Sequence, residues 1–409
     1  MTNVPEIRFK GFSEPWKQRK LCEVCDMGTG YTPSKSNPAF WENGTIPWIR
    51  LEDIRKNGRI LSDALQHVTP EAVKGKLIPA YSIIISTTAT IGEHALIIVD
   101  SLANQQFTFI TINVNCLKDL NPYFVFFVCY KLSDWCKTNT NSGGLLAVDM
   151  EGFKNWKFSF PCMEEQDKIA KLMMELYNSI EHHKQKLDGL KKLKKGYLQQ
   201  MFPQNGETVP KMRLKGFTEP WEQRRLGDIV ERITRKNTNL ESTLPLTISA
   251  QFGLVDQNDF FNKQVASKDV SGYFLVKNGE FAYNKSYSNG YPWGAIKRLD
   301  KYEMGVLSTL YIVFKPLDVE SEFLAQYYES NCWHTEVSQY CTEGARNHGL
   351  LNIAVGDFFE TKIKIPRDKE EQIAIGNFFR NLDNQITTQS QKVEQLQQLQ
   401  AAYLQKMFV

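Results

Sequence analysis

The stretch "IRFKGFSEPWKQRKL" (Ile7–Leu21) returns almost unchanged as "MRLKGFTEPWEQRRL" (Met212–Leu226), 205 residues later. That distance is about half of the 409-residue chain. It is far longer than the roughly 20 to 50 residues of a solenoid or propeller repeat. The sequence therefore predicts one large duplicated unit and not an array of short repeats.

A second pair of similar segments, Cys162–Phe202 and Asp368–Phe408, lies 206 residues apart. Both contain Glu-Glu-Gln near their start, and they end in "YLQQMF" and "YLQKMF". Each segment follows a proline, Pro161 or Pro366, which suits a strand or loop that ends where a helix begins. The apolar residues recur at alternating three- and four-residue steps, the spacing of a coiled-coil seam. Each segment is therefore predicted to be one long helix.

The two predicted seams carry polar residues at matching positions. The first seam comprises Ile169, Met173, Leu176, Ile180, His183, Leu187, Leu190, Lys194, Tyr197 and Met201. The second comprises Ile375, Phe379, Leu382, Ile386, Gln389, Val393, Leu396, Gln400, Tyr403 and Met407. Polar seam residues commonly fix register and partner choice. Because such a long helix cannot bury its apolar stripe alone, we predict that the two helices pack on each other, and a two-fold-like duplication favours antiparallel packing.

Two segments of about 150 residues flank the first long helix and hardly resemble each other beyond their opening lines. Both are predicted to be rich in strands, from runs such as "YSIIIST", "FTFITINVN" and "GVLSTLYIVFKP". Each ends in a shorter helical stretch, "NPYFVFFVCYKLSDWCKT" or "SEFLAQYYESNCWHTEV". The predicted fold is α+β and pseudo-two-fold, with two mixed α/β domains separated by an antiparallel coiled coil. Its predicted parts are domain 1–160, long helix 161–208, domain 209–365 and long helix 366–409.

Composition is that of a globular protein, with 42% hydrophobic and 23% charged residues and a net charge of +3. The longest apolar run, Tyr123–Tyr130, is too short to span a bilayer, and the first residues are polar and unlike a signal peptide. We therefore expect a cytoplasmic location. The small net charge does not indicate nucleic-acid binding by itself, but binding needs only a local basic patch.

Motifs that carry catalysis or hold a metal are not found in the sequence. It contains no GxxxxGK(S/T) phosphate loop, no GxSxG elbow and no HExxH zinc helix. The pair Cys22 and Cys25 has no second CxxC to complete a zinc site, and its repeat partner Gly227–Val230 has no cysteine. "NPAF" and "NPYF", beginning at Asn37 and Asn121, fit helix N-caps followed by proline better than a base-flipping motif. We predict no catalytic residue and no metal site.

Taken together, the chain resembles the specificity subunit of type I restriction-modification enzymes. The residues that carry the resemblance are the two repeated opening lines, "PWIRLEDI" (Pro47–Ile54), "ANQQFTFI" (Ala103–Ile110) and the paired starts and ends of the long helices. The order of these parts matches over essentially the whole chain.

The resemblance implies two variable target-recognition domains, each reading one half of a split, asymmetric double-stranded DNA sequence. It also implies that the coiled coil sets the distance between the half-sequences and docks two methyltransferase subunits. Those subunits would bind S-adenosylmethionine and methylate adenine, while motor-nuclease subunits would use ATP and Mg. The chain itself is then expected to be non-catalytic and to bind none of these cofactors.

For DNA contact we predict residues in polar loops, because amides suit adenine while Arg and Lys suit guanine or phosphate. In the first domain they are Lys35, Ser36, Arg50, Thr88, Thr90, Gln105 and Gln106. In the second they are Arg235, Lys236, Lys285, Tyr287, Asn289, Arg346, Asn347 and His348. Some of them also suit structural roles: Gln105 and Gln106 beside a strand, and Arg50 in an ion pair with Glu52 or Asp53.

The segment His182–Lys195 of the first long helix carries six lysines, whereas the second helix has mainly Gln and Thr there. A solvated helix face and a stripe that faces phosphates or a partner remain equally good interpretations.

Other functions fit the sequence less well. A self-contained DNA methyltransferase or nuclease would need the missing cofactor and catalytic motifs. A coiled-coil adaptor that never touches DNA would not need two dissimilar folded domains. A lone subunit of the same family that borrows methyltransferase partners is an alternative that the residues leave open.

Overall fold

The computed structural model describes residues 4–141, 146–204, 207–286, 291–341, 351 and 353–409. Contacts within the chain define two compact units, Met1–Gln185 with Ser390–Val409 (unit 1) and Lys186–Gln389 (unit 2). The two long helices are α5 (Met163–Gln200) and α11 (Lys369–Lys406). Each unit therefore contains one half of each long helix, whereas the sequence division treats each helix as a part of its own.

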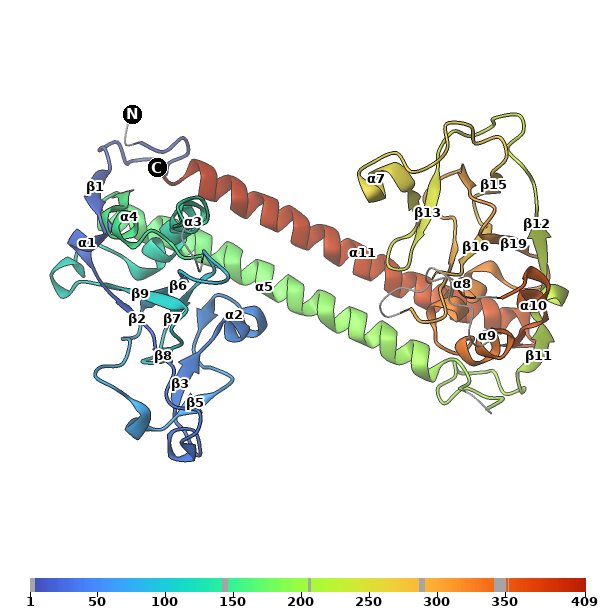
Figure 1. Cartoon of the computed structure of the whole chain (residues 1–409), viewed down its shortest axis with the longest axis horizontal. Helices are drawn as coiled ribbons and strands as arrows, with labels where there is room; N and C mark the ends of the chain where they lie inside the picture. Colours follow the sequence, from blue (N-terminus) through green and yellow to red (C-terminus); the bar gives the residue numbers. More distant parts are fainter. Residues whose placement is uncertain (1–3, 142–145, 205–206, 287–290, 342–350, 352) are drawn as a thin grey trace. The chain divides into compact units, whose positions relative to one another are not determined.

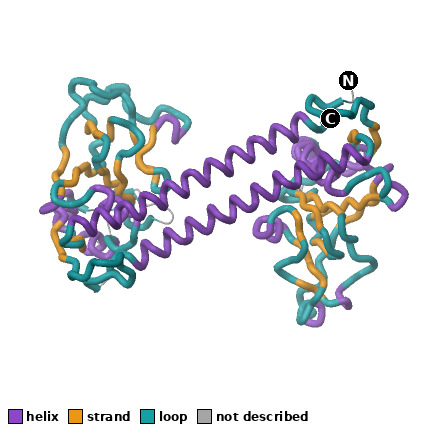
Figure 2. Tube along the Cα trace, turned by 180° about the vertical axis from the view of Figure 1, so that it is seen from behind, coloured by secondary structure: helices purple, strands orange, loops and turns teal. Residues whose placement is uncertain are grey.

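Both long helices have 38 residues, which corresponds to roughly 57 Å at ~1.5 Å per residue. Acidic residues occupy both first turns, where they suit the positive end of the helix dipole. All twenty predicted seam residues are buried or half-buried. Within each unit the two helix halves lie side by side and antiparallel (Figures 1 and 2).

The outer ends of the long helices belong to the cores of the units. In unit 1, Ile169 and Met173 of α5 share a core with Met407 and Phe408, which directly follow α11. In unit 2, Ile375 and Phe379 of α11 share a core with Met201 and Phe202, which follow α5. These seam positions therefore anchor each helix to a globular domain.

A five-stranded sheet with the order β2-β9-β6-β7-β4 forms the centre of unit 1. Its strands are β2 (Cys25–Thr29), β9 (Phe107–Ile112), β6 (Ser82–Ser86), β7 (His94–Ile97) and β4 (Ile60–Leu61). All neighbours are antiparallel except β4, which runs parallel to β7. Ile83 and Ile85 of β6 face the helix α3 (Pro122–Thr138), and Ile84 faces a second core on the other side. This alternation with period two is why an uninterrupted apolar run forms a strand buried on both faces.

The other elements of unit 1 are short. A three-stranded sheet has the order β5-β3-β8, with β5 (His67–Val68), β3 (Ile46–Ile49) and β8 (Leu102–Ala103). A two-stranded sheet joins β1 (Lys17–Lys20) to β10 (Lys157–Phe160). The helices are α1 (Leu21–Val24), α2 (Leu51–Asn57) and α4 (Met150–Asn155), with 3-10 turns η1 (Pro38–Phe40), η2 (Pro70–Ala72) and η3 (Val114–Cys116).

Unit 2 repeats the main sheet with four strands in the order β12-β19-β16-β17. They are β12 (Val230–Ile233), β19 (Ile312–Pro316), β16 (Phe281–Asn284) and β17 (Ala295–Arg298), covered by α8 (Ser321–Glu329). Two-stranded sheets pair β11 (Glu222–Arg225) with β20 (Lys362–Ile365), β13 (Leu246–Ser249) with β14 (Gly253–Asp256), and β15 (Phe274–Lys277) with β18 (Met304–Leu307). The remaining helices are α6 (Leu226–Ile229), α7 (Gln257–Phe261), α9 (His334–Tyr340) and α10 (Val355–Glu360).

Local capping agrees with the sequence in two places and differs in a third. Asn121 accepts hydrogen bonds from the backbone of Tyr123 and Phe124, and Asn37 accepts one from Ala39, which confirms both N-cap predictions. The stretch "SEFLAQYYESNCWHTEV", predicted as one helical stretch, forms α8 and α9 instead. Ser330 ends α8 in an extended conformation, and its hydroxyl donates to the Tyr327 carbonyl at 2.6 Å.

The repeated opening lines tie each globular domain to the long helix that follows it. Arg8 donates to both carboxylate oxygens of Glu165 at 2.7 and 2.8 Å, and Arg213 does the same to Glu371 at 2.7 Å for both contacts. Both carboxylates are almost completely buried, and each arginine forms a bidentate ion pair with its glutamate, which is a strong interaction. The repeat in sequence is therefore a repeat of one attachment.

A backbone hydrogen bond at the start of each line completes this attachment. Met212 N donates to the carbonyl of Gln200 at the end of α5, at 2.9 Å. Ile7 N donates to the carbonyl of Lys406 at the end of α11, at 3.0 Å. The first opening line thus contacts the last turn of the second long helix, so the two ends of the chain meet in unit 1 (Figure 1).

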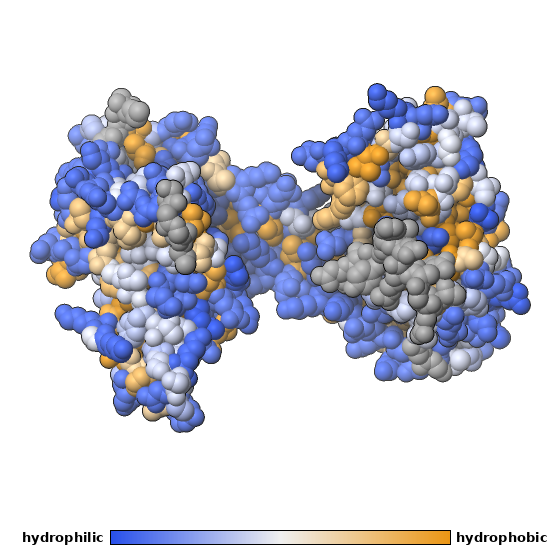
Figure 3. Space-filling view, in the orientation of Figure 1, coloured by the Kyte–Doolittle hydropathy of each residue, from blue (hydrophilic) through white to orange (hydrophobic). Residues whose placement is uncertain are grey.

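The surface is predominantly hydrophilic over the long helices (Figure 3). Exposed apolar residues gather near α7 in unit 2, where Phe252, Phe260 and Phe261 are 61%, 47% and 45% exposed. Among the described residues, none of the helices combines the length and apolar character needed to cross a membrane.

Candidate nucleic-acid interface

In unit 1, loops from four strands gather at one edge of the main sheet. Because β2, β9, β6 and β7 are antiparallel neighbours, β2 and β6 end at the edge where β9 and β7 begin. Backbone hydrogen bonds join these loops: Tyr31 N to the Ala103 carbonyl at 2.8 Å, and Thr87 N to the Gln106 carbonyl at 3.0 Å. The residues that the sequence predicted for DNA contact in this domain all lie in these loops or directly after β3, namely Lys35, Ser36, Arg50, Thr88, Thr90, Gln105 and Gln106.

Several of these side chains face solvent. Lys35, Ser36 and Gln105 are exposed, and Thr88, Thr90 and Gln106 are half-buried. The side-chain Oε1 of Gln105 accepts a hydrogen bond from the Thr32 hydroxyl, and Ser36 Oγ lies 2.9 Å from Ser34 Oγ. The edge therefore presents polar side chains that are partly held in place, as a base-reading surface requires.

Arg50 lies against its own domain. Its guanidinium pairs with Glu52 at 3.4 Å and with buried Asp53 at 3.8 Å, and lies 5.6 Å from the centre of the Trp48 ring. The ion-pair interpretation of Arg50 is thus confirmed, while its contact with DNA stays a prediction.

The corresponding edge of unit 2 carries the predicted residues of the second domain. Arg235 and Lys236 follow β12, and Lys285 follows β16, at the edge where β19 begins. The other predicted residues, Tyr287, Asn289, Arg346, Asn347 and His348, lie outside the described residues.

The described cations of this second edge contact acceptors of their own domain. Arg235 donates to both oxygens of Glu280 at 2.8 and 2.9 Å. Lys236 donates to the Gly272 carbonyl at 2.8 Å, and its ammonium lies 4.4 Å from the centre of the Phe274 ring. Lys285 donates to the Ile353 carbonyl at 3.4 Å. These contacts hold the loops of this edge in place, while contact of the three residues with DNA stays a prediction.

Sequence reasoning missed two exposed lysines in unit 1, Lys74 and Lys76. The Tyr31 hydroxyl donates to the Ala72 carbonyl at 3.1 Å and accepts from Lys74 N, so Lys74 and Lys76 lie in a loop that joins the edge with Lys35. Gly75 between them has a φ of +84°, which glycine adopts readily. The pattern Lys-Gly-Lys indicates a turn with two solvated cations, but only the tertiary contact with Tyr31 places it here.

A buried histidine lies where this edge meets α3. His94 begins β7 and packs against the rings of Phe126 and Tyr130, with centroids 5.5 and 4.6 Å apart. Burial, reinforced by the nearby Arg59 guanidinium, lowers the pKa of His94 from 6.5 to about 3. The imidazole is therefore neutral, and it adds no charge to the edge.

Groups of three or more His, Cys, Asp or Glu side chains that could hold a metal ion are absent from the described part of the chain.

A family model described as "Type I restriction modification DNA specificity domain" matches the chain twice, over residues 13–192 and 218–398. Among curated proteins, the type I restriction enzyme EcoprrI specificity subunit of Escherichia coli is 44% identical over 162 residues, which are 39% of this chain and 40% of that protein. The EcoR124I/EcoR124II specificity subunit of Escherichia coli is 33% identical over 186 residues, 42% of this chain and 44% of that protein. The chain thus spans about two fifths of the length of these relatives.

Solved structures match over nearly the full length. The S subunit of a type I restriction-modification system from M. genitalium gives a TM-score of 0.63 at 13% identity and covers 99% of both chains. A chain from a structure of complex assembly and conformational transition of the type I R-M system gives 0.51 at 17% identity, covering 96% of this chain and 97% of that one. At these identities the likeness concerns the fold.

Proposed function

The chain belongs to the family of type I restriction-modification DNA specificity domains, and on that premise we propose that it reads a split, asymmetric DNA sequence, one half with each recognition domain. The observation that carries this proposal is the pair of equivalent sheet edges with unlike residues. The edges follow the same strand order, β2-β9-β6-β7 and β12-β19-β16-β17, yet one offers Lys35, Gln105 and Gln106 and the other Arg235, Lys236 and Lys285.

Two unlike edges suit an asymmetric target. Base pairs contacted by the first edge form one half-sequence, and those contacted by the second form the other, while base pairs between them contribute backbone contacts at most. Exposed lysines such as Lys35, Lys74 and Lys76 would supply phosphate contacts, and amides such as Gln105 would contact base edges.

The long helices act as the spacer in this proposal. A coiled coil of fixed length keeps the two edges at a fixed distance, so the number of unread base pairs depends on helix length and not on the loops. Inserting or deleting a few residues in α5 and α11 together should change the gap and leave both half-sequences unaltered. A variant that reads a different half-sequence would contradict the spacer role.

The remaining chemistry belongs to partners. We propose that the helices dock two methyltransferase subunits, which bind S-adenosylmethionine and methylate adenine, and that motor-nuclease subunits with ATP and Mg complete the cytoplasmic enzyme. The chain would then contribute recognition and no catalytic step, which agrees with the absence of catalytic motifs from its sequence.

The decisive experiment is to co-express the chain with a methyltransferase subunit of this family in a methylation-free host and to map methylated adenines by single-molecule sequencing. A split motif with a fixed gap is the expected result. If a soluble complex with an active partner methylates nothing, the proposal fails in favour of a coiled-coil adaptor.

A further inference from the structure

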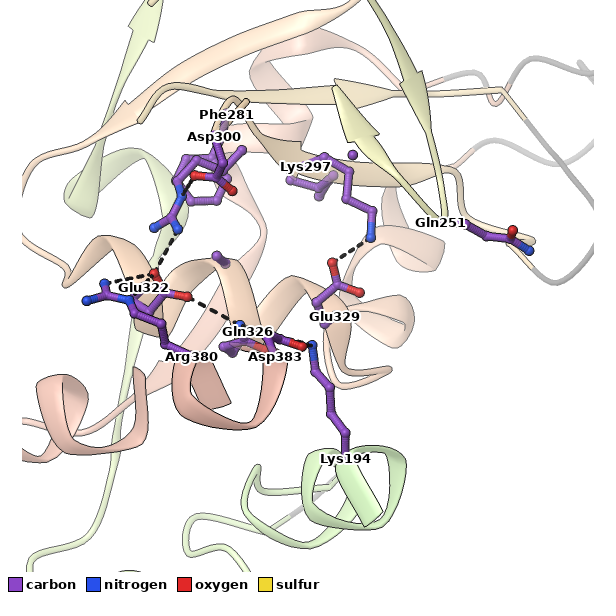
Figure 4. Close-up of a pocket in the computed structure, with 14 residues that line it drawn as sticks. Lys194, Gln251, Phe281, Lys297, Asp300, Glu322, Gln326, Glu329, Arg380 and Asp383 are labelled. Atoms are coloured by element: carbon purple, nitrogen blue, oxygen red, sulfur yellow. Dashed lines mark hydrogen bonds and ion pairs between the residues drawn. The ribbon is translucent and has the colours of Figure 1, made fainter. Parts of the chain in front are cut away.

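Asp383, in the first half of α11, links three elements of unit 2. Its carboxylate accepts from Lys194 Nζ of α5 at 2.6 and 2.8 Å, and from Gln326 Nε2 of α8 at 3.1 Å (Figure 4). One side chain therefore joins both long helices to the helix that covers the recognition sheet.

Glu322, one turn before Gln326, makes a second link. Its carboxylate accepts from Arg298 of β17 at 2.7 Å and from Arg380 of α11 at 2.9 Å, and Gln326 Nε2 also reaches it at 3.3 Å. Burial alone would raise the pKa of Glu322, but the two guanidinium groups hold the pKa below its ordinary value. The buried carboxylate is thus kept charged by one partner from the domain and one from the coil.

These residues line a cavity of about 370 Å³ between α8, β17 and the long helices. We call the set Lys194, Arg298, Glu322, Gln326, Arg380 and Asp383 the ionic joint. Gly376 of α11 permits its close packing, because a Cβ there would lie only 2.9 Å from the Glu322 Cβ. Unlike an apolar contact, which tolerates sliding, such a network of directed hydrogen bonds is satisfied in few relative orientations.

We propose that the ionic joint consists of positioning residues which fix the second recognition domain on the coil and thereby make the enzyme discriminate between gap lengths. This inference rests on the proposed function. Neighbouring base pairs are ~3.4 Å apart along each strand. A joint that lets the domain rock on the helices would therefore bring a half-sequence displaced by one base pair within reach.

The test compares methylation of duplexes that carry the mapped half-sequences at the native gap and at gaps one base pair shorter or longer. The chain is used in complex with its methyltransferase subunits. The variants are Asp383→Asn, which weakens the links to Lys194 and Gln326, and Lys194→Met, a milder change that leaves the domain side intact. The matched control is Asp188→Asn on α5, the same substitution at a side chain that is 62% exposed and pairs with Lys192.

We expect the ratio of wrong-gap to native-gap methylation to rise about tenfold in Asp383→Asn and less in Lys194→Met, since about 1.4 kcal/mol of lost discrimination is tenfold. The control should keep the wild-type ratio. The charge-swapped double variant Lys194→Asp with Asp383→Lys should recover part of the discrimination.

A merely structural role would lower thermal stability and total methylation but leave the ratio unchanged, and this outcome overturns the inference. If the wild-type complex methylates no split sequence, the proposed function itself fails, so the two failures are distinguishable.

Discussion

The two units attach a recognition domain to the coil at equivalent places with different chemistry. In unit 1, Tyr177 of α5 accepts a hydrogen bond from Arg59 N at 2.7 Å and packs edge-on against Phe126. In unit 2, the equivalent residue is Asp383 of the ionic joint, 206 residues later. We call Arg59, His94, Phe126, Tyr130 and Tyr177 the aromatic joint.

The two units share a contact between the repeated opening line and the helix that covers the sheet. The repeated tryptophans pack on the first phenylalanine of the covering helix, Trp16 on Phe124 at 5.8 Å and Trp221 on Phe323 at 5.7 Å between ring centres. Counting from these phenylalanines, Phe127 of α3 corresponds to Gln326 of α8. The duplicated scaffold has therefore kept its attachment while each recognition domain has acquired its own contact with the coil.

The largest expected effect concerns the shared attachment. Glu165→Ala and Glu371→Ala each leave an arginine with a side chain only 12% exposed and without its carboxylate. Each should lower the free energy of unfolding by ~3 to 5 kcal/mol, the usual cost of breaking a buried ion pair. Denaturant titration of the two variants measures this.

Glu164→Ala is the control, because its side chain is 73% exposed and its pair with Lys168 should contribute little. Clearly unequal losses for Glu165→Ala and Glu371→Ala would show that the two attachments are not equivalent.

The next effect is a pH dependence of stability between pH 7 and pH 5 that we expect in the aromatic joint and not in the ionic joint. His94 in the aromatic joint has a pKa lowered from 6.5 to about 3, so the folded state binds fewer protons than the unfolded state between these values. Stability is fully present above pH 6.5 and falls as the pH drops towards 3, by about 2 kcal/mol between pH 7 and pH 5. Hydrogen exchange of α3 against pH measures the loss, and His94→Phe should abolish this dependence; an unchanged slope would exclude His94 as the source.

A smaller effect is a salt dependence of local stability that we expect in the ionic joint and hardly in the aromatic joint. Raising the salt concentration from 0.1 to 1 M shortens the Debye length from ~10 to ~3 Å and should weaken the half-exposed Lys194–Asp383 pair most. We expect amide exchange in α8 to become about threefold faster while exchange in α3 hardly changes. Equal responses of α3 and α8 would contradict the contrast between the joints.

The smallest effect concerns the sheet edge of unit 1. Lys35→Ala, Lys74→Ala and Lys76→Ala should each weaken DNA binding of the complex by ~0.5 to 1 kcal/mol on all sequences and reduce the salt dependence by about one unit. Lys118→Ala, an exposed lysine beyond the opposite end of β9, should have no effect. Binding isotherms at several salt concentrations measure the affinity and the salt dependence of each variant. If Lys118→Ala weakens binding as much as the other three variants, the lysines of the edge have no specific role.

The helices and the sheets could be predicted from the sequence because each depends on a local period. The seam from Ile169 to Met201 and the strand around Ile83–Ile85 needed only spacing and apolar character. Gathering Thr88, Gln105 and Lys35 at one edge required the order of strands, which the sequence does not give.

The joints could not be predicted at all. The spacing predicts Lys194 as a polar residue of the seam. Its ion-pair partner Asp383 is identified only from the packing of α5 against α11. The inward orientation of Arg235 likewise depends on Glu280, 45 residues away. Pairing between distant charged residues follows tertiary packing and leaves no periodic signal in the chain.

The backbone hydrogen bond from Ile7 N to the Lys406 carbonyl brings the two ends of the polypeptide together without a covalent link. The equivalent hydrogen bond in unit 2 joins Met212 N to the Gln200 carbonyl, and there the residues between them also connect the two positions covalently. A rearranged polypeptide that starts at Met212, passes from Phe408 through a short linker into Ile7 and stops after Phe202 would preserve both contacts. These two contacts therefore do not depend on which half of the polypeptide is encoded first.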